Sequence, residues 1–204
     1  MTVDDIRGAI GVLPTPATSD AEDWRAERTV DLAETEKMVK LVVGGGIDML
    51  MTTATFGEVA TLTWPELEAF CECVIRTAAP HPVFVGVTTL NTRDTIARTR
   101  ALVKLGAAGV FSGRPMFIRL TDGQIIRYYQ DLAEALPGVP IIVYDNAETF
   151  RGPISTDVFR ALATIPEVVA ARQVGGAETD RNIEAVGSKI RFLPHDSRWL
   201  PSAR

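Results

Sequence analysis

The chain has 204 residues, of which 46% are apolar and 23% are charged, and its formal net charge is −5. This ordinary globular composition excludes a disordered or fibrous chain. An acidic balance without a basic stripe argues against nucleic acid or membrane partners, and two cysteines, Cys71 and Cys73, are too few for a disulfide scaffold. No apolar run approaches the ~20 residues of a membrane helix, and the first residues lack a signal-peptide core, so we expect a cytoplasmic protein.

Short apolar, β-branched runs alternate with longer amphipathic segments along the chain. The runs predict strands at residues 9–13, 47–52, 83–88, 109–112, 139–144, 168–171 and 190–193. Helical spacing of apolar residues predicts helices from Leu32 to about Val43 and over 65–75, 95–105, 125–136, 156–165 and 179–186. Near-continuous apolar strands are buried on both faces, which indicates a parallel sheet covered by helices.

Two architectures use this alternation. A doubly wound sheet needs a glycine-rich loop after its first strand, but here that strand is followed by Pro14, Thr15 and Pro16. A (β/α)8 barrel instead places its polar functional residues at the C-terminal ends of its strands. Polar residues lie at or just after the C-terminal ends of the predicted strands here, among them Thr55, Thr88, Ser112, Tyr144, Arg172 and His195. We therefore expect an α/β chain with a (β/α)8 TIM-barrel fold.

The number of strands falls short of a closed barrel. Seven are predicted, whereas a TIM barrel has eight strands and usually ~250 residues. We expect residues 1–204 to form a single incomplete TIM-barrel domain, truncated at the C-terminus after about the seventh strand. An open barrel leaves strand edges unpaired, so a homo-oligomer is expected.

The segment from Thr53 to Glu66 has the residues of a turn followed by a helix start. Thr63 is expected to begin a helix, with Glu66 three residues later completing a capping box. One interpretation of the string is a simple turn and helix cap. The other is that the Thr55 hydroxyl and nearby backbone N–H groups bind a small carboxylate. The residues alone leave both interpretations open.

Two further strand ends carry candidate chemistry. Tyr144 ends its strand either as a core residue with its hydroxyl at the rim or as a proton relay at the barrel mouth. His195 and Asp196 follow the seventh strand, where a rim residue and a helix N-cap are favoured over a catalytic dyad. His81 and His195 have no neighbouring ligands in the sequence, so no metal and no cofactor are predicted.

Taken together, these strings resemble the dihydrodipicolinate synthase/N-acetylneuraminate lyase family of pyruvate-dependent class I aldolases. The family's Gly-Thr-Thr-Gly-Glu loop corresponds to residues 54–58, and its Tyr-Asn-Xaa-Pro loop to residues 144–147, with Ala147 in place of proline. The Thr-Leu-Asn-Thr string at 89–92 and Gly-Arg-Pro-Met at 113–116 resemble the aromatic hydratase-aldolases, which cleave benzylidenepyruvates to an aromatic aldehyde and pyruvate.

The resemblance implies a Schiff-base lyase acting on a small keto acid. Thr55 and the amide of Phe56 would hold the pyruvyl carboxylate, and Tyr144 would carry protons. The Phe56 ring would stack on an aromatic substrate or, on the competing interpretation, pack over the sheet. Thr88 is a further substrate-binding candidate, and Asn91 would position water on the aryl side of the substrate.

Arg172 occupies the position of the family's Schiff-base lysine, because the string Val-Val-Gly-Ile-Lys reads Val-Val-Ala-Ala-Arg at 168–172. A Schiff base needs a neutral primary amine, whereas a guanidinium stays protonated. The sequence therefore predicts a lyase by family whose activity is impaired or absent in this chain. The alternative is a non-catalytic, degenerate or fragment paralogue that binds a keto acid or serves as an oligomer scaffold.

Overall fold

The computed structural model describes residues 1–174 and 178–193. The described strands form one parallel sheet: β1 (Ile10–Val12), β2 (Met49–Met51), β3 (Val83–Gly86), β4 (Gly109–Ser112), β5 (Ile141–Asn146), β6 (Val168–Val174) and β7 (Arg191–Leu193). The α-helices between them are α1 (Leu32–Gly44), α2 (Trp64–Ala78), α3 (Thr92–Lys104), α4 (Asp122–Ala135), α5 (Thr156–Leu162) and α6 (Thr179–Val186). Two 3-10 turns are η1 (Val3–Asp5) and η2 (Gly187–Lys189). None of the described helices combines the length and apolar character needed to cross a membrane.

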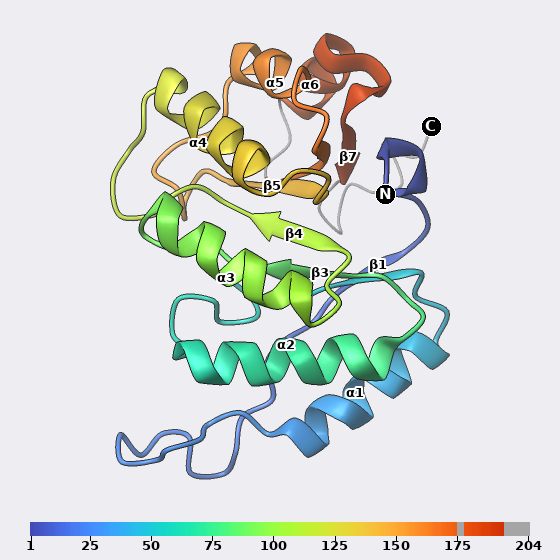
Figure 1. The fold of residues 1–204 in the computed structure, drawn as a ribbon, viewed down its shortest axis with the longest axis vertical. Coiled ribbons are helices and arrows are strands. Elements are labelled where there is room, and N and C mark those ends of the chain that lie inside the picture. Colours follow the sequence, from blue (N-terminus) through green and yellow to red (C-terminus); the bar gives the residue numbers. More distant parts are fainter. Residues whose placement is uncertain (175–177, 194–204) are drawn as a thin grey trace.

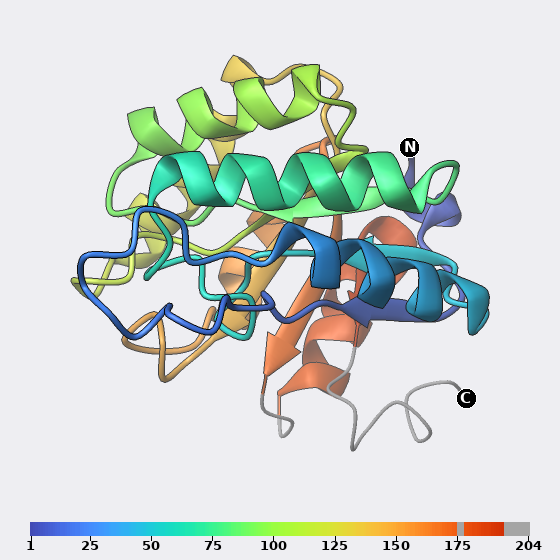
Figure 2. The ribbon, with the colours of Figure 1, turned by 90° about the horizontal axis from the view of Figure 1, so that it is seen from below.

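The sheet is curled, and the helices lie in an arc around its outer face (Figures 1 and 2). Its strands follow one another in chain order from β1 to β7, and every neighbouring pair is parallel. A doubly wound sheet would reverse its strand order part-way, so this order confirms the TIM-barrel architecture. Within the described residues, β1 pairs only with β2 and β7 only with β6, which leaves the barrel open.

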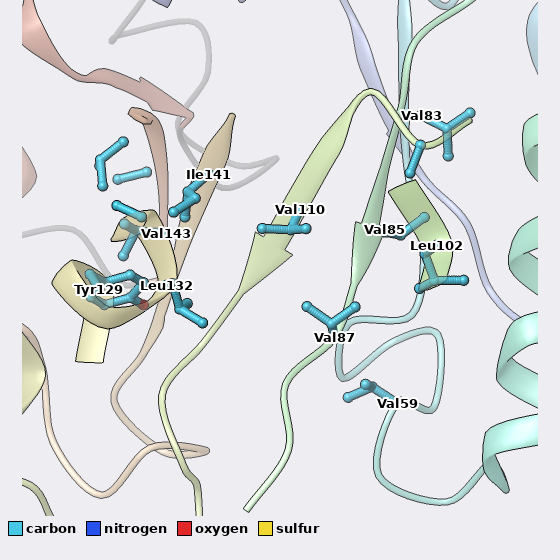
Figure 3. Close-up of a cluster of buried hydrophobic side chains, with 14 of the residues drawn as sticks. Val59, Val83, Val85, Val87, Leu102, Val110, Tyr129, Leu132, Ile141 and Val143 are labelled. Atoms are coloured by element: carbon cyan, nitrogen blue, oxygen red, sulfur yellow. The ribbon is translucent and has the colours of Figure 1, made fainter. Parts of the chain in front are cut away.

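Two apolar layers stabilise the curled sheet. The outer layer lies between strands and helices, where Val85, Val110 and Val143 belong to the same cluster as Leu102 of α3 and Leu132 of α4 (Figure 3). Full burial of such a side chain contributes about 1.5–3 kcal/mol. The inner layer fills the concave side and is formed by Ile6, Met49, Met51, Ala54, Phe84, Phe111, Ile142, Tyr144, Phe150, Val169 and Ala170.

Each predicted strand and helix is present, with ends that differ from the predicted bounds by up to three residues, and the strands that extend beyond their predicted ends are β5 and β6. Both strands continue past their apolar runs, and Tyr144 pairs in register with Arg172 and Asp145 with Gln173. Polar residues extend these strands because their side chains have buried partners. Successive side chains alternate between the two faces of a sheet. Tyr144 and Arg172 therefore face the barrel interior, whereas Asp145 and Gln173 face the helix layer.

The predicted capping box at the start of α2 is present. The Glu66 carboxylate accepts hydrogen bonds from the Thr63 N–H at 3.0 Å and from its hydroxyl at 2.6 Å. The other Glu66 oxygen accepts from the N–H and hydroxyl of Thr29 at 2.9 and 2.6 Å. These bonds lower the pKa of Glu66 from 4.5 to about 2. One carboxylate thus joins the segment before α1 to the start of α2.

Candidate functional site

The segment between β2 and α2 enters the mouth of the barrel through a close backbone approach. Thr53 has a positive φ of 42°, and its hydroxyl donates to the carbonyl of Gly86 at 2.9 Å and accepts from the Gly86 N–H at 3.0 Å. A Cβ on Gly86 would lie 1.9 Å from the Thr53 carbonyl oxygen, so only glycine fits here. This contact fixes where the chain turns toward Thr55.

A cavity of about 460 Å³ lies at the C-terminal ends of the strands. The residues that line it are Ile10, Val12, Ala54, Thr55, Phe56, Phe111, Tyr144, Asn146, Arg172 and Val174. The sheet therefore brings together four of the predicted site residues: Thr55, Phe56, Tyr144 and Arg172. Asn146 was not predicted as a site residue; its place in the Tyr-Asp-Asn string was the only signal for it.

The Tyr144 hydroxyl is the centre of the polar contacts in this cavity. It lies 3.1 Å from the Thr55 hydroxyl oxygen, and the Asn146 side-chain amide donates to it at 3.2 Å. The Tyr144 ring packs against Phe111, with centroids 4.7 Å apart, and meets Phe150 edge-on at 5.4 Å. A phenol with two polar neighbours, held between two rings, is suited to passing a proton to a bound ligand.

The charged side chain that lines the cavity is basic. Arg172 is the one charged side chain among the described residues that line it. The chain's four lysines lie elsewhere: Lys37 and Lys40 on α1, Lys104 at the end of α3, and Lys189 in η2, before β7 begins. In the part of the chain that the structure describes, no primary amine of a lysine therefore lines the cavity. Its chemistry suits an anionic ligand held without a covalent bond.

The backbone N–H groups of Thr55 and Phe56, predicted to bind a carboxylate, lie at the cavity. Within the described residues, no hydrogen bond from the N–H of Thr55 or Phe56 is present, while those of Gly57 and Glu58 donate to Ala54 and Thr55 carbonyls. Both Thr55 and Phe56 are exposed at the cavity. Backbone N–H groups that make no hydrogen bond within the described residues can donate to a ligand, and their role in binding a carboxylate stays a prediction.

Thr88 and Asn91 lie outside the main cavity. Thr88 lines a second cavity of about 210 Å³, which shares Thr55 and Tyr144 with the first, and its hydroxyl accepts from the Gly113 N–H at 2.9 Å. Asn91 is the N-cap of α3, where its side chain accepts from the Asp94 N–H at 2.9 Å. Their proposed contacts with substrate remain predictions, and the structure gives each of them a local structural role.

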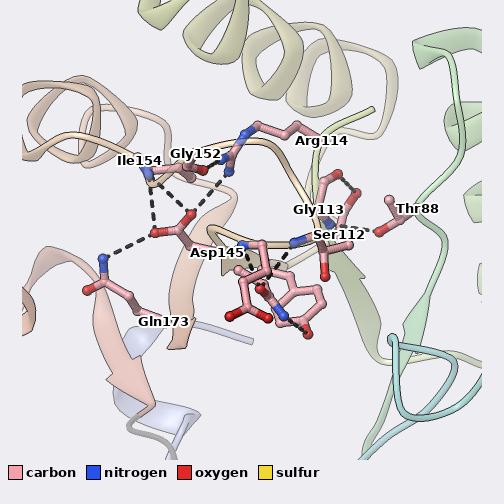
Figure 4. A network of polar contacts seen from close by, with 12 residues as sticks. Thr88, Ser112, Gly113, Arg114, Asp145, Gly152, Ile154 and Gln173 are labelled. Atoms are coloured by element: carbon pink, nitrogen blue, oxygen red, sulfur yellow. Dashed lines mark hydrogen bonds and ion pairs between the residues drawn. The ribbon is translucent and has the colours of Figure 1, made fainter. Parts of the chain in front are cut away.

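A buried ion pair lies behind the cavity and was not predicted. Arg114 Nη1 is 3.1 Å from Asp145 Oδ1, and both side chains are 2% exposed (Figure 4). Burial raises the pKa of Asp145, while the Arg114 guanidinium opposes that rise. Sequence reasoning treated Arg114 only as part of the Gly-Arg-Pro-Met string, and Asp145 only as the neighbour of Tyr144.

His195 and Asp196 lie outside the described residues. Across residues 1–174 and 178–193, no group of three His, Cys, Asp or Glu side chains is placed to hold a metal ion.

Comparison with known proteins places the chain in a family. Residues 11–193 match the dihydrodipicolinate synthetase family. The chain belongs to this family. Within it, the chain is 48% identical to a trans-2'-carboxybenzalpyruvate hydratase-aldolase from Nocardioides sp. (strain KP7), over 99% of this chain and 62% of that protein. It is 40% identical to a trans-O-hydroxybenzylidenepyruvate hydratase-aldolase from Sphingobium xenophagum, over 100% of this chain and 62% of that protein.

Solved structures of the dihydrodipicolinate synthetase family have the same fold. PhdJ bound to a substrate intermediate superposes with a TM-score of 0.97 at 47% identity, covering 100% of this chain and 64% of PhdJ. Dihydrodipicolinate synthase from Acinetobacter baumannii, complexed with pyruvate, superposes at 0.86 with 26% identity, over 95% of this chain and 65% of that one. The predicted resemblance to the family and to its benzylidenepyruvate hydratase-aldolases is confirmed. The chain spans about 62% of the length of the curated relatives it matches.

Proposed function

We propose that the main cavity binds the pyruvyl end of an aromatic 2-oxo acid of the benzylidenepyruvate type, as in a hydratase-aldolase lyase, and that Arg172 leaves this chain with little or no carbon–carbon cleavage. The observation that carries the proposal is the grouping of Thr55, Phe56, Tyr144 and Arg172 around one cavity. The identity to hydratase-aldolases supports the substrate class.

Each group has a proposed part in binding. The Thr55 hydroxyl and the Phe56 N–H hold the carboxylate of the pyruvyl group, and the exposed Phe56 ring covers the aromatic end. The Tyr144 phenol, 3.1 Å from the Thr55 hydroxyl oxygen, delivers or accepts a proton at the ligand's ketone oxygen. These roles come from the family resemblance and from the shared cavity.

Arg172 determines whether the bound keto acid can form an imine and be cleaved. Imine formation requires a nitrogen lone pair to attack the ketone carbon, after which the carbonyl oxygen leaves as water. The guanidinium of Arg172 is protonated and delocalised, so it makes no such bond. Without the iminium, the electron pair of the breaking carbon–carbon bond has no acceptor. Arg172 instead offers charge-assisted hydrogen bonds to an oxygen of the ligand.

Borohydride trapping with pyruvate tests this proposal. The unmodified chain should gain no covalent adduct in its mass spectrum, whereas Arg172→Lys should gain one on the new lysine. Arg181→Lys, which adds a lysine on the exposed surface of α6, is the matched control and should gain none. An adduct on the unmodified chain, or pyruvate release from a benzylidenepyruvate at the rate of a true aldolase, would overturn the assignment of Arg172.

The second candidate function is binding of a keto acid without catalysis. It is favoured by the guanidinium of Arg172 in the lining and by the absence of a lysine from the described lining. Calorimetric titration with a benzylidenepyruvate separates the two. Binding without pyruvate release, in both the chain and its Arg172→Lys variant, would support the binder. Slow release that rises in Arg172→Lys would support the impaired lyase.

A further inference from the structure

The buried pair of Arg114 and Asp145 connects segments at the C-terminal ends of three neighbouring strands. Besides Arg114, the Asp145 carboxylate accepts from the Ile154 N–H at 3.1 and 3.2 Å and from Gln173 Nε2 at 3.1 Å. Arg114 also donates to the carbonyl of Gly152 (Figure 4). The pair thereby joins the loop after β4, the loop after β5 and the end of β6.

The network continues into the helix layer. Gln173 Oε1 accepts from the Thr179 hydroxyl at 3.1 Å and from Asn182 Nδ2 at 3.2 Å, both on α6. Gln173 follows Arg172 directly, just as Asp145 follows Tyr144, and the two pairs lie side by side in register. The network therefore contacts β5 and β6 on the face away from the cavity, through the residues next to those that line the cavity.

A ring contact through Phe150 links this network to the Tyr144 side chain. The Arg114 guanidinium lies 5.2 Å from the centroid of the Phe150 ring, and that ring meets Tyr144 edge-on at 5.4 Å. The Phe150 ring packs against Gly113, where a Cβ would lie 2.0 Å from the ring, so only glycine leaves space for it. The position of Phe150, and with it the Tyr144 ring, thus depends on where Arg114 is held.

Removing two charges from water costs free energy, and apolar residues of similar volume often stabilise a protein as well as a buried ion pair or better. The stability of the fold therefore does not by itself explain why a buried ion pair is present here. We propose that Arg114 and Asp145 are positioning residues that hold the Tyr144 hydroxyl against Thr55, at the geometry needed for the ligand's ketone oxygen. This inference rests on the proposed function for its ligand, but the placement of Tyr144 is measurable without one.

The ligand-free test uses tyrosine NMR. The chain has three tyrosines, so isotope-labelled protein gives three ring signals, and Tyr144→Phe identifies that of Tyr144. In Asp145→Asn, the Tyr144 signal should shift or broaden. The signal of buried Tyr128, whose hydroxyl is hydrogen-bonded to the Ser112 hydroxyl, should be unchanged. Asp131→Asn, which removes the surface partner of Arg127 on α4, is the matched control and should move neither signal.

The ligand-dependent test is a double-mutant cycle read by calorimetric titration with a benzylidenepyruvate. Asp145→Asn should weaken binding about three- to tenfold, the effect of one misplaced hydrogen bond to a ligand. In the Tyr144→Phe background the same substitution should have almost no effect, because the group through which Asp145 acts is gone. A merely structural role would weaken binding equally in both backgrounds.

Asp145→Asn leaves the Arg114 charge buried without its partner, so it can unfold the chain. Arg114→Gln/Asp145→Asn removes both charges and is used in that case, with the same expected results. An unmoved Tyr144 signal in a folded variant, or additive effects on affinity, would overturn the positioning role. If the unmodified chain binds no benzylidenepyruvate, the proposed function fails, and the NMR result alone decides whether Arg114 and Asp145 position Tyr144.

Discussion

The carboxylate of Glu66 is expected to stabilise the fold in a strongly pH-dependent way. It accepts four hydrogen bonds from Thr29 and Thr63, which lower its pKa from 4.5 to about 2. A group with a lowered pKa in the folded state contributes its full stability above its unfolded value and loses it as the pH falls through the folded value. For Glu66 that loss takes place between about pH 5.5 and pH 2.

The size of the effect follows from the change in pKa. The fall from 4.5 to about 2 corresponds to a ceiling of roughly 3.4 kcal/mol at neutral pH. Glu66 is partly exposed, so solvent screens part of this, and a glutamine keeps some of the hydrogen bonds. Glu66→Gln should therefore lower the free energy of unfolding by about 1–2 kcal/mol at pH 7.

Urea denaturation of the chain and of Glu66→Gln at pH 7 and near pH 2.5 measures the difference directly. Taking the difference between the two proteins cancels the titration of all other carboxyl groups. Glu72→Gln, at an exposed position in the middle of the same helix, is the control and should change little at either pH. A Glu66→Gln difference of equal size at both pH values would refute the reasoning, as would an equal loss in Glu72→Gln.

Two further outcomes follow from close packing around β2 and β3. Gly86→Ala should destabilise the chain by about 3 kcal/mol or more in urea denaturation, because its Cβ would lie 1.9 Å from the Thr53 carbonyl oxygen; unchanged stability would show that the backbone there is free to shift. Burial raises the pKa of the Cys71 thiol to about 11, so about a thousandth is thiolate at pH 8. Peptide mass spectrometry should find Cys71 unmodified by iodoacetamide in the native protein and modified in urea, and fast native labelling would contradict its burial.

The sequence by itself determined the order and type of the elements and the end of the sheet at which the candidate site residues gather. Apolar runs of strand length, separated by helical spacing, are local patterns, and parallel strands necessarily bring their C-terminal ends to one edge. That is why Thr55 and Tyr144, 89 residues apart, could be placed together before any contact was known, and they lie 3.1 Å apart. The assignment of Arg172 to the position of the family's lysine also comes from the sequence alone and stays a prediction.

Only the tertiary structure decided which polar side chains pair. Asp145 and Arg114 are 31 residues apart, and their contact depends on the paths of the loops that follow β4 and β5. The spacing of apolar residues in the sequence does not predict the paths of these loops. The extension of β5 to Asn146, which turns that side chain toward the Tyr144 hydroxyl, depends on pairing with β6. Burial makes such pairings specific, because a charge or amide removed from water must find its partner in space, however far away that partner is in the chain.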